Sequence, residues 1–206
     1  MGSYGSYQYV RNTAWECLLK HGITSLPVDI LWIAKGENCI RVIKNSSVNM
    51  LEPSEDARSY YANGIWYIVY DDRCDVATAR YAIAHELGHY FLAHDSKHNE
   101  YVGRPTAKNA VPEHEADEFA CRLLCPSCIL CGIGAVTPQD ISALCLVNEE
   151  VACARAKRLD ALIKRNSFLV SSLERDMYVS FLPFIEANKR PDAVRLTSIE
   201  QISRKS

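Results

Sequence analysis

The chain has 206 residues, of which 48% are hydrophobic, and its formal net charge at pH 7 is −2. This length and apolar content suffice for one well-formed hydrophobic core. A charge so close to zero gives no general attraction to nucleic acid or to an anionic membrane surface. No apolar run is long enough to cross a bilayer, and the first residues do not resemble a signal peptide. We therefore expect a cytoplasmic protein that has no membrane partner.

The first part of the chain predicts helices followed by a small sheet. Apolar residues at helical spacing indicate a helix that Gly22 ends, and Pro27 is expected to open a second helix. Asn63-Gly64 lies between two alternating segments, which is typical of a tight β-hairpin. We expect helices over 7–21 and 28–35, a strand over 39–43, a loop over 45–55, and hairpin strands over 59–62 and 65–70.

The next segment, His85-Glu86-Leu87-Gly88-His89, has the HExxH pattern of zinc hydrolases. Residues four apart lie on one face of an α-helix, so His85 and His89 can both reach one metal ion. Glu86 flanks that position, where a carboxylate can act on the water that attacks a peptide bond. The flanking residues predict a buried helix that is capped by Asp75 and runs to about His94.

Gly88 is unfavourable within a helix. We expect it to permit the close approach of another backbone or of a substrate.

Zinc in a hydrolase typically takes three protein ligands and keeps a fourth position for water. Pro112 favours the first turn of a new helix, which places Glu113 in that turn as our candidate third ligand. Asp117 lies one turn further on the same face, where its carboxylate could orient a ligand histidine. Glu115 points elsewhere on such a helix, but Glu115 and His114 remain alternative ligands.

Residues 95–110 join the two helices that would share the metal, so we expect them beside the cleft. Hydrolysis of an amide develops negative charge on the carbonyl oxygen. Tyr101, His98 and His114 are candidates to stabilise this oxyanion, although a solvated loop would explain the same residues.

Nine cysteines are present, an odd number that favours free thiols in a reducing compartment over a disulfide framework. The spacing of Cys121, Cys125, Cys128 and Cys131 overlaps iron–sulfur patterns. The first two fall on the helix that carries Glu113, beside apolar residues, which favours ordinary core cysteines. A second metal or redox site at this cluster remains an alternative.

The C-terminal part predicts more helices. Thr137-Pro138 opens one, and Asn148 caps another over 149–164. Two helices joined by a tight turn can form a helix-turn-helix, but Glu149 and Glu150 occupy the end that would enter a DNA groove. We therefore predict a structural or substrate-recruiting pair rather than a DNA reader. Its basic residues are Arg155, Lys157, Arg158, Lys164 and Arg165. We further expect a helix over 169–185, interrupted near Pro183, and a loose tail from Ala187.

The HExxH segment is followed by Glu113-x-x-Ala116-Asp117-x-Phe119-Ala120-x-x-Leu123-Leu124-x-Pro126, and together they resemble the ImmA/IrrE family of zinc metallopeptidases. Pro27-Val28-Asp29-Ile30 is similar to the N-terminal segment of that family, and residues 141–159 are similar to its C-terminal helices. Cys125 and Asp117 depart from the Met and Asn that the family often has there. The resemblance implies one zinc ion in a gluzincin-like site formed by His85, His89 and Glu113. It also implies cytoplasmic cleavage of a helix-turn-helix repressor or an antitoxin, often encoded on mobile elements.

We thus predict an α+β, zincin-like minimal metallopeptidase with a small antiparallel sheet, an HExxH helix and a helical C-terminal part. Residues 1–135 would form the peptidase core, and residues 136–206 a helical region of the same domain. The predicted function is a zinc-dependent endopeptidase that acts on a repressor or antitoxin. The alternative is a non-proteolytic transcriptional regulator or DNA-binding protein in which zinc is structural.

Overall fold

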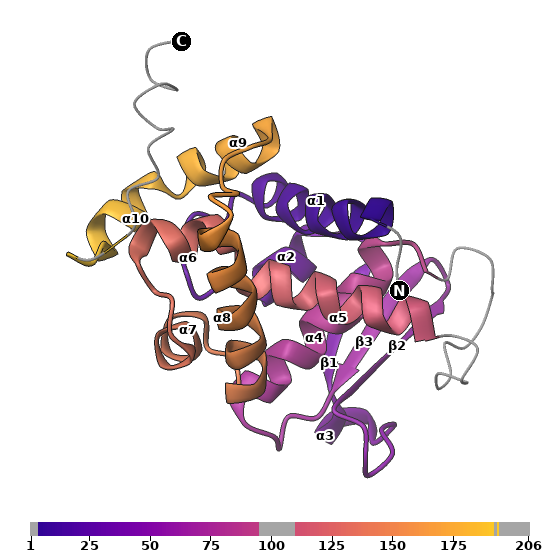
Figure 1. The fold of residues 1–206 in the computed structure, drawn as a ribbon. Coiled ribbons are helices and arrows are strands. Elements are labelled where there is room, and N and C mark those ends of the chain that lie inside the picture. Colours follow the sequence, from indigo (N-terminus) through magenta and orange to yellow (C-terminus); the bar gives the residue numbers. More distant parts are fainter. Residues whose placement is uncertain (1–3, 95–109, 192, 194–206) are drawn as a thin grey trace.

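The computed structural model describes residues 4–94, 110–191 and 193 (Figure 1). Helices pack with a small three-stranded sheet, so the predicted α+β class is confirmed. Within the described part of the chain, no helix has both the length and the apolar character that crossing a membrane requires. The oxyanion candidates His98 and Tyr101 lie outside the described residues.

Two helices come first. α1 (Tyr4–Lys20) is followed by Gly22 at a φ of +64°, a backbone conformation that suits glycine. α2 (Ile30–Gly36) begins two residues later than predicted. Its start is fixed by Asp29, whose carboxylate accepts a hydrogen bond from the backbone N–H of Trp32 at 2.9 Å. Pro27 belongs to the connection that precedes this helix, so the expectation that it opens α2 was wrong.

The sheet has the strand order β1-β3-β2, with β2 at one edge. β2 (Ala57–Ala62) and β3 (Ile65–Tyr70) pair antiparallel around the predicted turn, where Asn63 and Gly64 both have positive φ. β1 (Ile40–Lys44) pairs with β3 in parallel, so the sheet is mixed rather than purely antiparallel.

A short helix, α3 (Asn45–Val48), lies where the sequence predicted a loop. It is held by the side-chain oxygen of Asn45, which accepts hydrogen bonds from the backbone N–H groups of Met50 and Leu51.

The two helices that carry the HExxH segment and Glu113 pack directly on each other. α4 (Val76–Phe91) begins at Asp75, which accepts from the N–H of Thr78, as predicted. α5 (Ala110–Leu124) crosses α4 at Gly88, where a Cβ atom would lie 3.0 Å from the Cα of Ala116 and 3.2 Å from its carbonyl oxygen. The expected close approach of another backbone at Gly88 is therefore confirmed. α4 ends three residues earlier than predicted, because the chain turns at Ala93.

The remaining helices complete one continuous core. Buried side chains form a single cluster that includes Leu18 in α1, Phe119 in α5 and residues of the C-terminal helices. Figure 1 shows α5 between α1 and α4. The division of the chain at residue 135 stays a prediction. The C-terminal helices are α6 (Ser127–Ile133), α7 (Pro138–Cys145), α8 (Glu149–Lys164), α9 (Ser172–Ser180) and α10 (Leu182–Asn188).

The last predicted helix is in fact two helices. α9 starts at Ser172, because the hydroxyl of Ser171 caps it by accepting from the N–H of Glu174. The break falls at Phe181, immediately before α10, whose second residue is Pro183.

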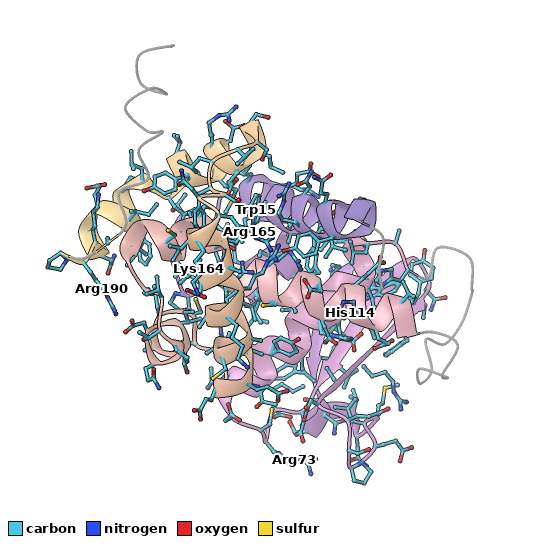
Figure 2. All side chains as sticks on the ribbon, viewed as in Figure 1. Trp15, Arg73, His114, Lys164, Arg165 and Arg190 are labelled. Carbon is cyan, nitrogen blue, oxygen red and sulfur yellow. The ribbon has the colours of Figure 1, made fainter. Side chains whose placement is uncertain are left out.

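The α7–α8 pair has the predicted caps, but some of its basic side chains pack against other parts of the protein. Arg155 is buried, and its Nε donates to the carbonyl oxygen of Cys125 at 2.6 Å. The guanidinium of Arg158 lies over the ring of Tyr7, 4.9 Å from its centroid. Lys164 and Arg165 are exposed near the end of α8 (Figure 2). Two of the five basic residues are thus used for packing inside the protein.

Candidate metal centre

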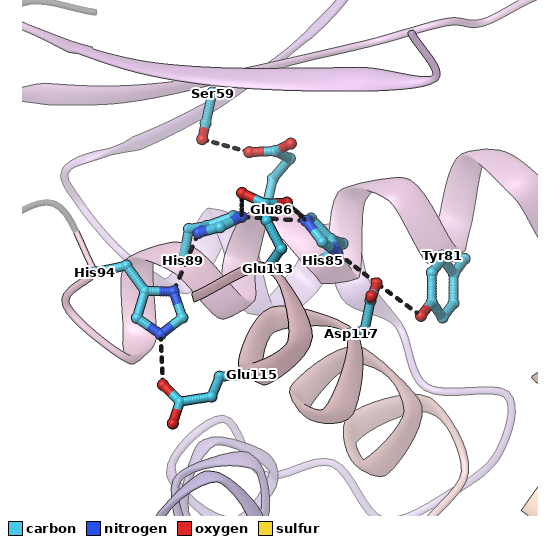
Figure 3. A network of polar contacts seen from close by, with 9 residues as sticks. All are labelled: Ser59, Tyr81, His85, Glu86, His89, His94, Glu113, Glu115 and Asp117. Carbon is cyan, nitrogen blue, oxygen red and sulfur yellow. Dashed lines mark hydrogen bonds and ion pairs between the residues drawn. The ribbon is translucent and has the colours of Figure 1, made fainter. Parts of the chain in front are cut away.

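Three side chains from two helices converge at the crossing of α4 and α5 (Figure 3). The Nε2 atoms of His85 and His89 are 3.1 Å apart. The carboxylate oxygens of Glu113 lie 3.3 Å from Nε2 of His85 and 3.6 Å from Nε2 of His89. Two imidazole nitrogens and a carboxylate are a typical donor set for a catalytic metal ion. These residues therefore form a group that could hold a metal ion.

The structure brings these three residues together because of where they lie in their helices. His85 and His89 are one turn apart on α4, and Glu113 lies in the first turn of α5. The contact at Gly88 lets α5 approach closely enough for Glu113 to reach both rings. Glu115, the alternative ligand, is not in this group and instead contacts His94, while His114 is exposed.

Glu86 lies beside the two histidines but points toward the sheet. Its side chain is mostly buried, with 8% of the residue surface exposed, and it accepts a hydrogen bond from the hydroxyl of Ser59 in β2. Burial raises the pKa of Glu86, while the hydrogen bond from Ser59 opposes this rise. A carboxylate with a raised pKa is suited to accept and return a proton near neutral pH.

Asp117 contacts the His85 ring at Nδ1, the nitrogen that does not face the other possible ligands. Nδ1 of His85 lies 2.9 Å from Oδ1 of Asp117, and the hydroxyl of Tyr81 donates to the same oxygen at 3.1 Å. Burial raises the pKa of Asp117, but the hydrogen bond and charge of His85, together with the hydrogen bond from Tyr81, outweigh burial and keep it below its usual range. Burial disfavours a charged His85, yet its hydrogen bonds to Asp117 and Glu113 raise its pKa to about 10. A metal ion must therefore displace a proton from this ring.

Sequence reasoning missed the roles of Ser59 and Tyr81, and it placed His94 near the end of a helix without giving it a role at the site. His94 now lies 3.1 Å from His89, measured between the two Nδ1 atoms, and its Nε2 is 3.2 Å from Glu115. One signal was available for Ser59, because it is a polar residue at an inward position of a strand. Nothing in the local sequence pointed to Tyr81, which meets its partner 36 residues away.

The four cysteines of the proposed cluster do not form a second metal-binding group. Among the described residues, no group of three or more potential ligands other than His85, His89 and Glu113 was found. Cys125, Cys128 and Cys131 are fully buried, and burial raises the pKa of the Cys131 thiol to about 11. These thiols contribute to the core, as the favoured interpretation of the sequence held.

Comparison with known protein families identifies the chain. Residues 40–157, more than half of the chain, match the model of the IrrE N-terminal-like domain, peptidase family M78. The chain belongs to this family. The matched M78 segment runs from β1 into α8 and contains the HExxH segment and Glu113. No curated protein matches the chain. The resemblance to ImmA/IrrE peptidases is confirmed, and the possible metal-binding group lies within the matched peptidase domain.

Proposed function

We propose that this protein is a zinc-dependent endopeptidase with His85, His89 and Glu113 as the zinc ligands. The observation that carries the proposal is the spacing of their donor atoms. A tetrahedral zinc ion with bonds of about 2.0–2.1 Å holds its ligand atoms about 3.3 Å apart. The Nε2 atoms of the two histidines are 3.1 Å apart, Oε2 of Glu113 lies 3.3 Å from Nε2 of His85, and Oε1 of Glu113 lies 3.6 Å from Nε2 of His89, all close to this value.

The chain supplies the proton transfers that peptide hydrolysis needs. Bound zinc would polarise the scissile carbonyl and lower the pKa of a water molecule toward neutrality. Glu86 takes the proton of the attacking water and later delivers it to the leaving amine. Ser59 orients the Glu86 carboxylate through its hydrogen bond. Asp117 orients His85, so that Nε2 of this ring faces the ligand group.

We further propose that the substrate is a cytoplasmic helix-turn-helix repressor or an antitoxin. Membership of the M78 family and the resemblance to ImmA/IrrE peptidases support this assignment. The strand order also suits an extended peptide, because β2 lies at the sheet edge and carries Ser59 beside Glu86. A substrate segment can add to such an edge by backbone hydrogen bonds.

Glu86→Gln and Glu113→Ala separate catalysis from metal binding. We expect about one zinc per chain in the wild type and in Glu86→Gln, and much less in Glu113→Ala, as measured by elemental analysis. Cleavage of a candidate repressor should fall by about 10²–10⁴-fold or more in Glu86→Gln, because the general base is lost. Normal cleavage by this variant would contradict the mechanism. A salt-dependent DNA complex that survives the substitution, without cleavage, would favour the non-proteolytic regulator.

A further inference from the structure

The end of α4 brings a third histidine against the ligand histidines. Ala93 has a φ of +54°, its N–H donates to the carbonyl of Tyr90 at 3.1 Å, and the N–H of His94 donates to the carbonyl of His89 at 3.2 Å. These two hydrogen bonds define a Schellman motif. The motif usually brings two apolar side chains together. Here the two positions hold His89 and His94, whose ring centroids are 5.1 Å apart at an interplanar angle of 74°.

Hydrogen-bond chemistry then assigns the proton of each ring. Nε2 of His89 faces the ligand group, so a metal-bound His89 carries its proton on Nδ1 and must donate it. The acceptor is Nδ1 of His94, at 3.1 Å. A neutral imidazole that accepts at Nδ1 carries its own proton on Nε2. That proton points to a carboxylate oxygen of Glu115, at 3.2 Å.

We propose that His94 and Glu115 are positioning residues for His89, joined in a chain from carboxylate to imidazole to ligand. This inference rests on the proposed function, because it assumes that His89 binds a metal ion. This series of hydrogen bonds from Glu115 through His94 to His89 plays the same part as the direct hydrogen bond between Asp117 and His85. Each ligand histidine is thereby supported by a carboxylate of α5, one directly and one through His94 (Figure 3).

Because His94 is buried, losing its hydrogen bond with His89 would be costly in free energy. Only 8% of its side-chain surface is exposed, so water cannot readily replace it as the acceptor for His89. A buried N–H that loses its acceptor costs about 1–3 kcal/mol. Outer partners of this kind typically change metal affinity by roughly 10- to 100-fold when they are removed.

Three variants distinguish positioning from mere packing. His94→Leu removes the acceptor. His94→Asn keeps an oxygen near the place of Nδ1 but cannot reach Glu115. Glu115→Gln keeps an acceptor for His94 and removes only the charge. Glu150→Gln is the matched control, because it removes the same charge from an exposed position of α8.

The readouts are zinc affinity, measured by competition with a chelator, and the visible spectrum of the cobalt-substituted protein. We expect His94→Leu to bind zinc about 10- to 100-fold more weakly and to change the cobalt spectrum. His94→Asn should recover most of the affinity, Glu115→Gln should lose less than His94→Leu, and the control should match the wild type.

Two outcomes would overturn the inference while leaving the proposed function intact. One is a His94→Leu protein with the affinity and cobalt spectrum of the wild type. The other is equal weakening by His94→Leu and His94→Asn, since the acceptor atom would then be irrelevant. A wild-type protein that binds no zinc would instead reject the proposed function, and the inference with it.

Discussion

Ser59 is a buried polar residue in a strand, and it contacts the proposed general base. It is 1% exposed at an inward position of β2, where an apolar side chain would be ordinary, and its hydroxyl donates to the buried carboxylate of Glu86. Removing the hydroxyl would take away this hydrogen bond and leave the Glu86 carboxylate with only the backbone hydrogen bond of Ser59 to orient it. The strand thus controls the orientation of the proposed general base.

Ser59→Ala should lower kcat by roughly 10- to 100-fold with little change in KM or zinc content, because a small misplacement of a catalytic group has an effect of about this size. Steady-state kinetics on a cleaved repressor, with elemental analysis of the same samples, would measure this. Ser54→Ala, at an exposed loop position, is the control. An unchanged kcat would mean that packing and the backbone hydrogen bond of Ser59 suffice to hold Glu86.

For single residues, the sequence predicted the site residues that follow helical spacing, and it missed the contacts between residues far apart in the chain. His85, Glu86 and His89 follow from spacing, and Pro112 indicated the turn that holds Glu113. Ser59 meets Glu86 across 27 residues, so no local pattern could pair them. His94 returns to His89 through a left-handed residue that is alanine, where glycine would have signalled the turn.

Among the secondary-structure elements, the crossing of α4 and α5 decides whether the site exists. The two histidines and the glutamate come from different helices, and the separation of these helices is set by the missing side chain of Gly88. An added Cβ atom would meet the Cα of Ala116 at 3.0 Å and the ring of Phe119 at 3.2 Å. Backbone atoms cannot rotate away, so α5 must shift.

Gly88→Ala should therefore destabilise the protein despite the better helix propensity of alanine. The propensity gain is at most about 1 kcal/mol, whereas overpacking costs about 1–3 kcal/mol. Zinc affinity should fall as well, because α5 carries Glu113. Urea unfolding and chelator competition on this variant would test both effects. A gain in unfolding free energy with unchanged zinc affinity would show that the crossing tolerates the methyl group.

The elements themselves were predictable to the extent that their signals are local. Asp75, Thr137 and Asn148 cap their helices as expected, because short polar side chains accept from the first free N–H groups. α3 spans one turn, too short for a periodic pattern. The parallel pairing of β1 with β3 depends on a distant partner, so it could not be derived from the strand alone.

At the scale of the whole molecule, the hydrophobic core includes residues outside the segment that matches the family. Residues 40–157 exclude α1, yet Val10, Ala14 and Leu18 of α1 are all buried in the common cluster. Burial of a large apolar side chain contributes about 1.5–3 kcal/mol, and domains are stable by only about 5–15 kcal/mol. Loss of this helix would remove much of that margin.

A fragment of residues 40–157 should accordingly fail to fold cooperatively. Its near-ultraviolet circular dichroism should be weak, and its thermal unfolding broad, compared with the full chain. A cooperative transition at the temperature of the full chain would show that the matched segment folds alone. Residues 1–157 serve as the comparison, because they restore α1 and α2 while still lacking the end of α8 and all of α9 and α10.

The position of α1 offers a way to control the proposed peptidase activity. α5 lies between α1 and α4, so the helix that carries Glu113 is supported on one side by a segment with no chemical role (Figure 1). The ring of Tyr7 in α1 packs against the guanidinium of Arg122 in α5, 4.1 Å from the ring centroid. A binder that pulled α1 away would release α5 and disable the proposed zinc site without touching a ligand. Binding at α1 could thus control the proposed active site from a distance.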